Sequence, residues 1–349
     1  MSTPNRDPIV TVQQHILEAQ RRRPGATGEL SWLLCGITLA TKIIQAQVRR
    51  AGLLDVLGST GETNVQGETV QRLDRLANET ILRCLGYRGN IGIMVSEEED
   101  EPRIVQEAGD AGRYIVLFDP LDGSSNIDCN VSIGTIFSVL ERQPEVHQRD
   151  VMSHVLQPGR RQVAAGYVLY GSSTVMAYTT GQGVHMFTLD PAIGAYVLHQ
   201  EDVRMPAQGR TYSVNEAYAP HFPAGVQTYL DWVKSPLSGG YSQRYVGSLM
   251  ADFHRTLLRG GIFLYPETTK NPEGKLRLLY EANPLAWLAE QADGRATDGR
   301  QAILDKQPGA LHERTPLYLG SRDQVARVQS FLEAKPAAEI RLAAAHCGA

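Results

Sequence analysis

The sequence predicts a layered α/β protein with a mixed sheet, and three observations support this fold class. Apolar residues recur with helical spacing over residues 30–50 and again over residues 70–85. Short runs rich in β-branched residues and tyrosine, separated by turns, occupy residues 114–190. From residue 203 to residue 345, strand-like runs are mixed with helical patterns. Such a mixture predicts layers of helices and sheet, with a mixed sheet favoured over an all-parallel one.

The two predicted N-terminal helices flank a glycine-rich segment. The first helix, over residues 30–50, is expected to end at Gly52. Residues 52–68 are predicted to form a long loop, which in a compact domain is usually functional or disordered. The second helix, over residues 70–85, is expected to end at Gly86. Its Asp74 points toward the apolar face, so it is either paired or metal-bound, or it is a boundary residue that reaches solvent.

The remaining elements are predicted from the same patterns. Strands are expected at residues 133–140, 163–170, 174–179, 261–265 and 317–319, and helices at residues 284–292 and 323–334. Asn283 and Pro284 are interpreted as the N-cap and first residue of one of these helices. A weak seam near residue 200 predicts domains over residues 1–200 and 201–335, followed by a flexible tail over residues 336–349.

Composition excludes several classes of protein. The chain has 349 residues, 42% of them apolar, and a net charge of −4, so no overall field attracts nucleic acid or an acidic membrane. A phosphate site must therefore be a local basic patch. The four cysteines include no CxxC pair, which argues against a zinc ribbon and a disulfide scaffold. We find no signal-peptide pattern and no membrane span, and we expect a cytoplasmic protein with reduced thiols.

Acidic residues follow two of the apolar runs. Residues 114–118 lead directly into Asp-Pro-Leu-Asp-Gly-Ser-Ser-Asn at 119–126, and residues 91–95 lead into Ser-Glu-Glu-Glu-Asp at 96–100. If the two strand ends are adjacent, their carboxylates form a site for hard divalent cations. The Gly-Ser-Ser turn beside them offers backbone N–H groups to a phosphate. The combination indicates metal-assisted phosphate chemistry.

Each of these motifs also has an ordinary interpretation. Asp-Gly alone is usually a turn, and an acidic run is usually a solvated surface. Residues 119–130 do not fit an EF-hand, because the Asp spacing is wrong and Asn130 stands at the position of the bidentate Glu. Neither a P-loop nor GxGxxG is present. The basic, tyrosine-rich segment 241–280 either binds phosphate and sugar or carries scattered surface charge.

The chain resembles class I fructose-1,6-bisphosphatases, within the lithium-sensitive, magnesium-dependent phosphatase superfamily. The similarity extends from about Thr27 to Ser321 and rests on motifs that begin with VSEE at 95–98 and FDPLDGSSNID at 118–128. Further motifs are LQPGRRQVAAGYVLYG at 156–171, RYV at 244–246, GGIFLYP at 260–266 and GKLRLLYEANP at 274–284. The resemblance implies the sugar phosphatase fold, a layered α-β-α-β-α sandwich with mixed sheets.

The resemblance implies a role for each matching residue. Metal ligands would be Glu97, Glu98, Asp119, Asp122 and Glu281, with the Leu121 carbonyl. Asp74, Glu98 and Glu68 would position or deprotonate the attacking water. The cleaved phosphate would be held by Gly123, Ser124, Ser125 and Arg277. The sugar and the distal phosphate would be held by Asn215, Tyr218, Tyr245, Tyr265 and Lys275. Arg244 would reach the site of a neighbouring subunit, which implies a homotetramer.

An allosteric AMP site of the family resembles Thr27, Gly28, Glu29 and Ser31, together with Arg113 and Tyr114. Here the sequence departs from the family pattern. Ser31 replaces a threonine, and Glu141 stands where many members have an arginine. A further departure is Asp293, where the family tends to have glycine. The regulatory cysteines of the chloroplast form are missing, so thioredoxin control is not expected.

The expected reaction is hydrolysis of the 1-phosphate of fructose 1,6-bisphosphate to fructose 6-phosphate, with two or three Mg²⁺ (or Mn²⁺) per subunit. A first alternative is sedoheptulose-1,7-bisphosphatase activity, because one additional carbon gives only about 1–3 kcal/mol of discrimination. Inositol monophosphatase activity is less favoured, because a monophosphate needs no second basic cluster. A non-catalytic sensor of AMP or sugar phosphates is the alternative from a different class.

Overall fold

The computed structural model describes residues 8–21, 27–54, 59–63, 69–105 and 112–334. The chain forms two compact units. The first comprises Met1–Gln157, Arg161–Val203 and Ser248–Ala251, and the second comprises Pro158–Arg160, Arg204–Gly247 and Asp252–Ala349. Glu68 and the predicted tail over residues 336–349 lie outside the described residues.

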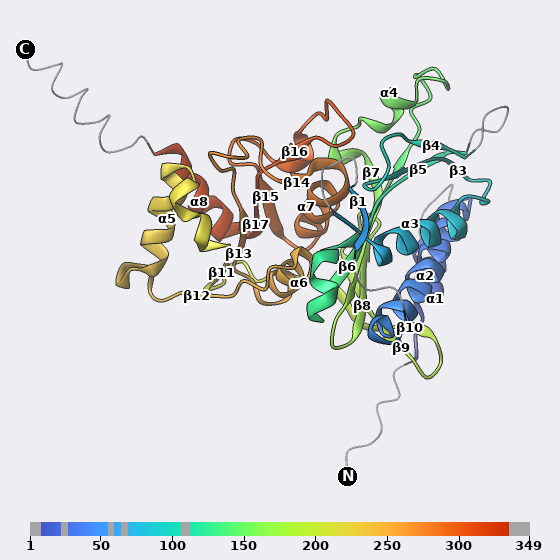
Figure 1. The fold of residues 1–349 in the computed structure, drawn as a ribbon, viewed down its shortest axis with the longest axis horizontal. Helices are drawn as coiled ribbons and strands as arrows, with labels where there is room; N and C mark the ends of the chain where they lie inside the picture. Colours follow the sequence, from blue (N-terminus) through green and yellow to red (C-terminus); the bar gives the residue numbers. More distant parts are fainter. Residues whose placement is uncertain (1–7, 22–26, 55–58, 64–68, 106–111, 335–349) are drawn as a thin grey trace, which may run out of the picture. The chain divides into compact units, whose positions relative to one another are not determined.

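The first unit is built on a sheet of eight strands in the order β10-β9-β8-β7-β6-β5-β3-β4 (Figure 1). β3 and β5 are parallel, and every other neighbouring pair is antiparallel, so the predicted mixed sheet is confirmed. The strands are β3 (Ile91–Ser96), β4 (Arg103–Ile104), β5 (Tyr114–Asp122), β6 (Ile133–Glu141), β7 (Gln162–Tyr170), β8 (Thr174–Thr179), β9 (Val184–Asp190) and β10 (Ala195–Val203).

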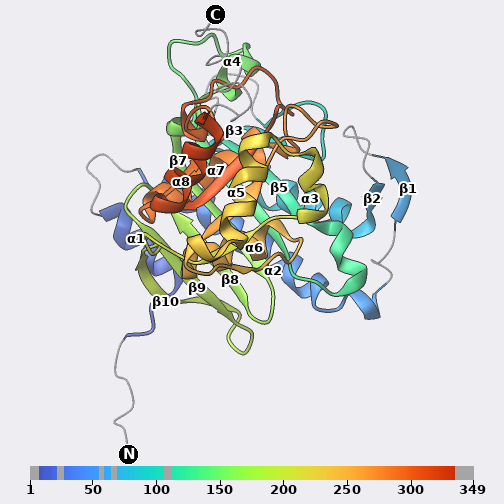
Figure 2. The same cartoon turned by 90° about the vertical axis from the view of Figure 1, so that its left-hand side faces the viewer.

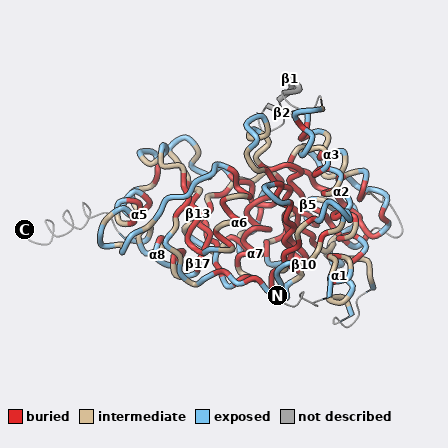
Figure 3. The backbone as a smooth tube through the Cα atoms, turned by 90° about the horizontal axis from the view of Figure 1, so that it is seen from below, coloured by how far each residue is buried: buried red, intermediate tan, exposed pale blue. Residues whose placement is uncertain are grey.

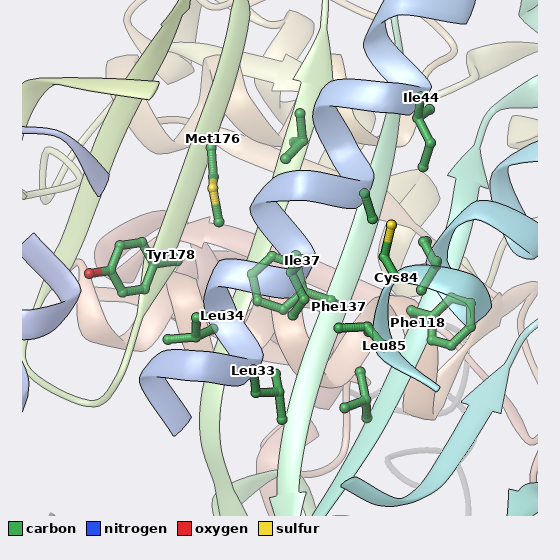
Figure 4. Close-up of a cluster of buried hydrophobic side chains, with 14 of the residues drawn as sticks. Leu33, Leu34, Ile37, Ile44, Cys84, Leu85, Phe118, Phe137, Met176 and Tyr178 are labelled. Carbon is green, nitrogen blue, oxygen red and sulfur yellow. The ribbon is translucent and has the colours of Figure 1, made fainter. Parts of the chain in front are cut away.

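The helices of the first unit are α1 (Val12–Arg21), α2 (Glu29–Val48), α3 (Arg72–Leu85) and the short α4 (Val151–Val155). Side chains of α2 and α3 meet side chains of the strands in one apolar core, shown in Figure 4. Leu34 and Ile37 of α2 and Leu85 of α3 belong to this core, as do Phe118 and Phe137 of the sheet. All nine residues of β5 are buried, and Figure 3 shows this part of the chain in red. The core therefore holds β5 rigidly in place.

The structure corrects the prediction of one long loop over residues 52–68. A short 3-10 helix spans Ala51–Leu53, and strand β1 (Ser59–Thr63) pairs in antiparallel fashion with β2 (Thr69–Gln71). Val70, predicted to begin the second helix, belongs to β2, and α3 begins at Arg72. Four glycines and many polar residues in this segment obscured the alternation that predicts a strand. Residues 55–58 and 64–68 are outside the described part of the chain.

The second unit contains a five-stranded sheet in the order β12-β11-β13-β17-β15. Its strands are β11 (Thr211–Ser213), β12 (Ser242–Gln243), β13 (Ile262–Tyr265), β15 (Gly294–Thr297) and β17 (Leu317–Ser321), while β14 (Leu276–Arg277) pairs separately with β16 (Arg314–Thr315). The helices are α5 (Ala224–Lys234), α7 (Asn283–Gln291) and α8 (Arg322–Glu333), with α6 (Leu249–Arg259) belonging to this unit from Asp252 onward. α5 and α8 lie side by side in Figures 1 and 2 and contribute Tyr229 and Val328 to a second apolar core.

The start of α7 differs from the prediction. Asn283 is already helical and Ala282 is the N-cap residue, because a π-helical turn over Leu278–Ala282 leads directly into α7. The Asn-Pro motif predicted that the helix starts at Asn283 after a non-helical segment, and the π-helical turn before it was not predicted. Within the described ranges, no helix combines the length and the apolar character that crossing a bilayer would require.

Candidate active site

Two neighbouring parallel strands of the first unit carry acidic residues at their carboxyl ends. In the register of β3 and β5, Ser96 lies opposite Phe118, and the Glu97 N–H donates to the Phe118 carbonyl over 3.0 Å. Glu97 therefore leaves β3 at the level where β5 continues into Asp119. The two acidic strand ends are therefore adjacent, which is the condition that the sequence set for a shared cation site.

Helix α3 brings a further carboxylate toward these strand ends. The Ser96 hydroxyl donates to the Asn78 side-chain oxygen over 2.7 Å, so the middle of α3 lies beside the end of β3. Asp74 lies one helical turn before Asn78, and because α3 and β3 run in opposite directions this places it beyond the end of β3. Its side chain is buried, which rules out the interpretation of a boundary residue that reaches solvent.

The acidic residues of this edge are almost fully buried. The exposed fractions are 3% for Asp74, 6% for Glu97, 7% for Asp119 and 8% for Asp122. The carboxylates of Asp119 and Asp122 accept hydrogen bonds from the backbone N–H groups of Leu121 (3.0 Å) and Met250 (3.2 Å). Several buried carboxylates in one place need positive charge to remain ionised, and oxygen ligands of this kind suit Mg²⁺ or Mn²⁺. The residues of this edge therefore fit a divalent cation.

A hydrogen-bond chain fixes the turn that carries Glu97 and Glu98. The Ser96 hydroxyl accepts the Glu98 N–H over 3.2 Å, and the Asn78 amide donates to Glu99 over 3.0 Å. Glu99 is also held by two hydrogen bonds from Arg103, of 2.6 and 2.7 Å. Glu99 is thus paired with Arg103, whereas the backbone of Glu97 contacts β5.

The segment after β5 forms a tight turn. Gly123 has a φ of 77°, in the left-handed region that favours glycine, and a 3-10 helix follows over Ser124–Cys129. The Asn126 N–H donates to the Gly123 carbonyl over 2.8 Å. The first N–H groups of a helical turn point outward from its start, so the backbone of Ser124 and Ser125 is suited to an anion.

In the second unit, Glu281 lies in the π-helical turn and is buried. Its carboxylate accepts the backbone N–H of Arg277, which is itself buried. Turns of this kind occur frequently at functional sites. Glu281 and Arg277 are thus held together by the local backbone of one five-residue stretch.

Asn215, Tyr218 and Tyr245 form a polar group in the second unit. Asn215 caps the 3-10 helix over Glu216–His221 by accepting the Ala217 N–H over 3.2 Å. Burial raises the pKa of the Tyr245 hydroxyl, and its hydrogen bond with Asn215 opposes this rise. Tyr218 is exposed, and its hydroxyl contributes to the raised pKa of Tyr245. These hydroxyl and amide groups can donate to phosphate or sugar oxygens.

Asp252 fixes the loop that carries Arg244 and Tyr245. Its carboxylate accepts the N–H groups of Val246 (3.1 Å) and Gly247 (3.0 Å) and the Ser213 hydroxyl (2.8 Å). Burial raises the pKa of Asp252, while these hydrogen bonds oppose the rise. The Arg244 side chain is exposed at the surface of this unit.

Tyr265 ends β13, and Lys275 is exposed just before β14. Gly274, which precedes Lys275, has a φ of 81°, and a Cβ atom there would lie 2.2 Å from the Thr315 backbone. Only glycine fits this close approach, so the position of Lys275 depends on it. Tyr265 and Lys275 both belong to the second unit.

The residues proposed for AMP line a cavity of about 180 Å³ in the first unit, between α1, the start of α2 and the start of β5. Thr27, Gly28, Ser31, Arg113 and Tyr114 all line it, whereas the Glu29 side chain does not. Glu141 is a further lining residue, and its carboxylate accepts a hydrogen bond from Arg113 over 3.0 Å. The Ser31 hydroxyl donates to Gln20 over 2.6 Å.

Two positioning residues were not predicted from the sequence. Asn78 and Asp252 hold the turn of Glu98 and the loop of Tyr245, respectively. Asn78 lies one turn after Asp74, on the same buried face of α3. This spacing is the sequence feature that could have identified Asn78 as a neighbour of the site. Asp252 is an acidic residue in an amphipathic helix, where nothing in the sequence separates it from surface residues.

Comparison with known proteins gives consistent matches along nearly the whole chain. The family model described as "Fructose-1-6-bisphosphatase, N-terminal domain" matches residues 10–201, and the corresponding C-terminal domain matches residues 205–333. "Fructose-1,6-bisphosphatase class 1" of Chloroherpeton thalassium is 50% identical over 326 residues, covering 93% of each chain. That of Chlorobium luteolum is 53% identical over 93% of this chain and 98% of its own.

A solved structure is also similar. The crystal structure of Leishmania major fructose-1,6-bisphosphatase in holo form aligns with a TM-score of 0.89 and 38% identity, covering 94% of this chain and 100% of the other. The predicted layered fold is confirmed by this likeness.

Proposed function

Because the chain belongs to the fructose-1,6-bisphosphatase family along nearly its whole length, we propose that its hydrolytic site is the buried acidic edge of β3, β5 and α3. The chain is a phosphoric monoester hydrolase whose substrate is fructose 1,6-bisphosphate. The bond broken is that of the 1-phosphate. The observation that carries the assignment of the site is the burial of three carboxylates at adjacent strand ends, together with the burial of Asp74 on α3.

The proposed ligand set for divalent cations is Glu97, Glu98, Asp119, Asp122 and Glu281, with the Leu121 carbonyl. The family is metal-dependent, and we propose Mg²⁺, with two or three ions per chain and Mn²⁺ as a substitute. When bound, such ions neutralise phosphate charge and lower the pKa of a coordinated water. Asp74 and Glu98 accept the proton of the attacking water, and Glu68 assists them from a segment outside the described residues.

The other proposed contacts hold the substrate. Backbone N–H groups of Gly123, Ser124 and Ser125, together with Arg277, bind the phosphate that is cleaved. The sugar and distal phosphate are bound by residues of the second unit, namely Asn215, Tyr218, Tyr245, Tyr265 and Lys275. Positioning and charge neutralisation are most of what the protein supplies to phosphoryl transfer.

The test of the function is a measurement of phosphate release on a substrate panel. We expect release from fructose 1,6-bisphosphate that stops in EDTA and returns with excess Mg²⁺ or Mn²⁺. Activity that is unchanged in EDTA would exclude the metal mechanism. Sedoheptulose 1,7-bisphosphate, measured alongside, decides whether the chain accepts both sugars, and binding without turnover would indicate a sensor.

We propose in addition that the chain forms a homotetramer in which Arg244 completes the site of a neighbouring subunit. Arg244 is exposed, and Asp252 and Arg255 hold the backbone around it, so its side chain is presented from a fixed loop. Sedimentation velocity tests the tetramer. Mixing inactive Asp122→Asn chains with Arg244→Ala chains tests the sharing, because only shared sites regain activity.

We also propose that the cavity of the first unit binds AMP only weakly. A phosphate placed at the start of α2 would be favoured by the helix N-terminus and by Arg113. Glu141 already neutralises Arg113 and adds a negative charge to the cavity wall. We therefore expect AMP inhibition to be weak, and a titration of activity with AMP measures it.

A further inference from the structure

We propose that the first unit carries a second metal site, for a zinc-class divalent ion, formed by His15, His185 and Glu201. These residues come from α1, β9 and β10, respectively. One candidate ligand atom from each lies within 4.8 Å of the other two. Two imidazoles and one carboxylate are a ligand set typical of Zn²⁺ and related transition ions, not of Mg²⁺. The site is therefore chemically distinct from the acidic edge.

The hydrogen bond between His15 and Tyr178 leaves the Nε2 atom of His15 facing the proposed ion. His15 Nδ1 lies 2.6 Å from the hydroxyl of Tyr178, a buried residue of β8. With the hydrogen on Nδ1, the lone pair of Nε2 faces the Glu201 carboxylate, 3.9 Å away. Metal-bound histidines usually donate their other ring N–H to a fixed acceptor in this way.

His185 is held in a complementary arrangement. Its Nε2 atom lies 3.2 Å from the Gln182 carbonyl, which can only accept, so the hydrogen resides on Nε2. Its Nδ1 atom accepts a long hydrogen bond of 3.3 Å from the Asp202 N–H. An ion bound at Nδ1 would therefore replace only this long hydrogen bond. The ring centroids of His15 and His185 are 4.3 Å apart.

A bulge in β10 brings Glu201 into the group. Gln200 pairs with Met186 and Val203 pairs with Val184, so Glu201 and Asp202 together lie opposite His185. Bulges of this type redirect a side chain and often occur next to functional sites. The ligands of tetrahedral zinc are about 3.4 Å apart for bonds of about 2.0–2.1 Å. The exposed Glu201 side chain can close the remaining gap, and a water molecule completes the coordination.

Occupancy of this site would link α1 to the strand pair β9–β10. The residues just before α1 already contact β10, through the bridge of Thr11 with Val197 and the hydrogen bond from the Leu198 N–H to the Val10 carbonyl. α1 also contributes Ile16 and Gln20 to the cavity lining. An ion at the start of α1 would thus hold one wall of this cavity in place.

The test is equilibrium dialysis of metal-free protein against Zn²⁺ in excess Mg²⁺, with bound zinc measured by mass spectrometry. Mg²⁺ fills the oxygen ligands of the acidic edge but not a histidine site. We expect wild type and His199→Gln to retain about one more zinc per chain than His185→Gln and Glu201→Gln. His199 is the matched control, an exposed histidine of β10 outside the group. Tyr178→Phe should weaken zinc binding about tenfold or more, because it removes only the hydroxyl that orients His15.

Two results would overturn the site: no zinc retained by wild type, or equal retention by wild type and the two ligand variants. Zinc held by the cysteines instead would give the second result. The side chains of His185 and Glu201 are partly or fully exposed, so folded variants are expected, and circular dichroism checks this. If one of them fails to fold, the other decides the outcome.

Discussion

At the scale of single residues, the buried carboxylates of the acidic edge are unusual, because folding must remove them from water. Burial of an isolated ionised carboxylate is very unfavourable unless other groups compensate its charge. Asp119 and Asp122 each receive a backbone hydrogen bond, which is partial compensation. Bound cations would supply the rest. These carboxylates lower the stability of the folded protein when no cation is bound, and this is expected where they serve a hydrolytic site.

Replacement of Asp122 by Asn tests this directly. The amide keeps the shape and removes the charge, so kcat should fall by about two to four powers of ten. Asp128→Asn is the matched control, since Asp128 is an exposed acid of the same motif. Steady-state kinetics at saturating Mg²⁺ provides the measurement. Comparable activity of the two variants would remove Asp122 from the proposed ligand set.

Asn78 should act through the residues it positions. Asn78→Ala removes the contacts to Ser96 and Glu99, and the Glu98 turn is then less constrained. We expect a lower kcat and a higher Mg²⁺ concentration for half-maximal activity, with little change in KM for substrate. Glu79→Ala, an exposed neighbour on α3, should leave all three values unchanged. A loss of thermal stability alone, with normal Mg²⁺ dependence, would mean that Asn78 is only structural.

At the scale of elements, the sequence predicted best where periodicity was strong. The helix predicted over residues 30–50 is α2, and the strand predicted over residues 133–140 is β6. The sequence also showed that two strands end in carboxylates, but only the structure shows that these strand ends are adjacent. The π-helical turn before α7 was not anticipated, since its hydrogen-bond pattern has no distinct sequence periodicity. The hydrogen bonds of Asp252 to Ser213, Val246 and Gly247 were not predicted either, because they form only in the tertiary structure.

The turn before β14 should be sensitive to a single methyl group. Gly274→Ala forces a left-handed φ onto a residue with a Cβ atom and brings that atom against the Thr315 backbone. We expect destabilisation of more than about 1 kcal/mol and weaker substrate binding through the adjacent Lys275. Gly52→Ala is the control, because a Cβ atom there meets nothing within 4 Å. Urea denaturation compares them, and equal midpoints would contradict the expected strain.

At the scale of the whole molecule, one ion pair should shape acid stability. The pKa of Asp298 is lowered: burial opposes ionisation, but hydrogen bonds from the Gln301 and Arg300 N–H groups and from Lys306 outweigh it. A lowered folded-state pKa stabilises the protein above the unfolded value of about 3.9, and this stability is lost as pH falls through the folded pKa.

Asp298→Asn should therefore cost about 1–3 kcal/mol at neutral pH, because Lys306 loses its charged partner. The difference from wild type should shrink below about pH 4, where Asp298 of wild type becomes protonated as well. Urea denaturation at several pH values measures this. Asp231→Asn, at an exposed site, is the comparison. A difference that does not depend on pH would show that lost packing, not lost charge, causes the effect.

The proposed ligand set also makes metal binding a property of the whole chain, since it takes residues from both family domains. A ligand that binds only the folded protein raises the melting temperature, and the rise increases with its concentration. Mg²⁺ should therefore stabilise wild type and Asp128→Asn. It should stabilise Asp122→Asn and Glu281→Gln much less, although the two variants alter different domains.

The metal-free proteins provide the necessary baseline. Removal of a buried carboxylate relieves charge repulsion, so both ligand variants should melt at or above the temperature of metal-free wild type. Their order should then reverse when Mg²⁺ is added. Differential scanning calorimetry with and without EDTA measures both conditions. If Glu281→Gln gains as much from Mg²⁺ as wild type does, Glu281 is not a ligand, and the ions are held by the acidic edge of β3 and β5 alone.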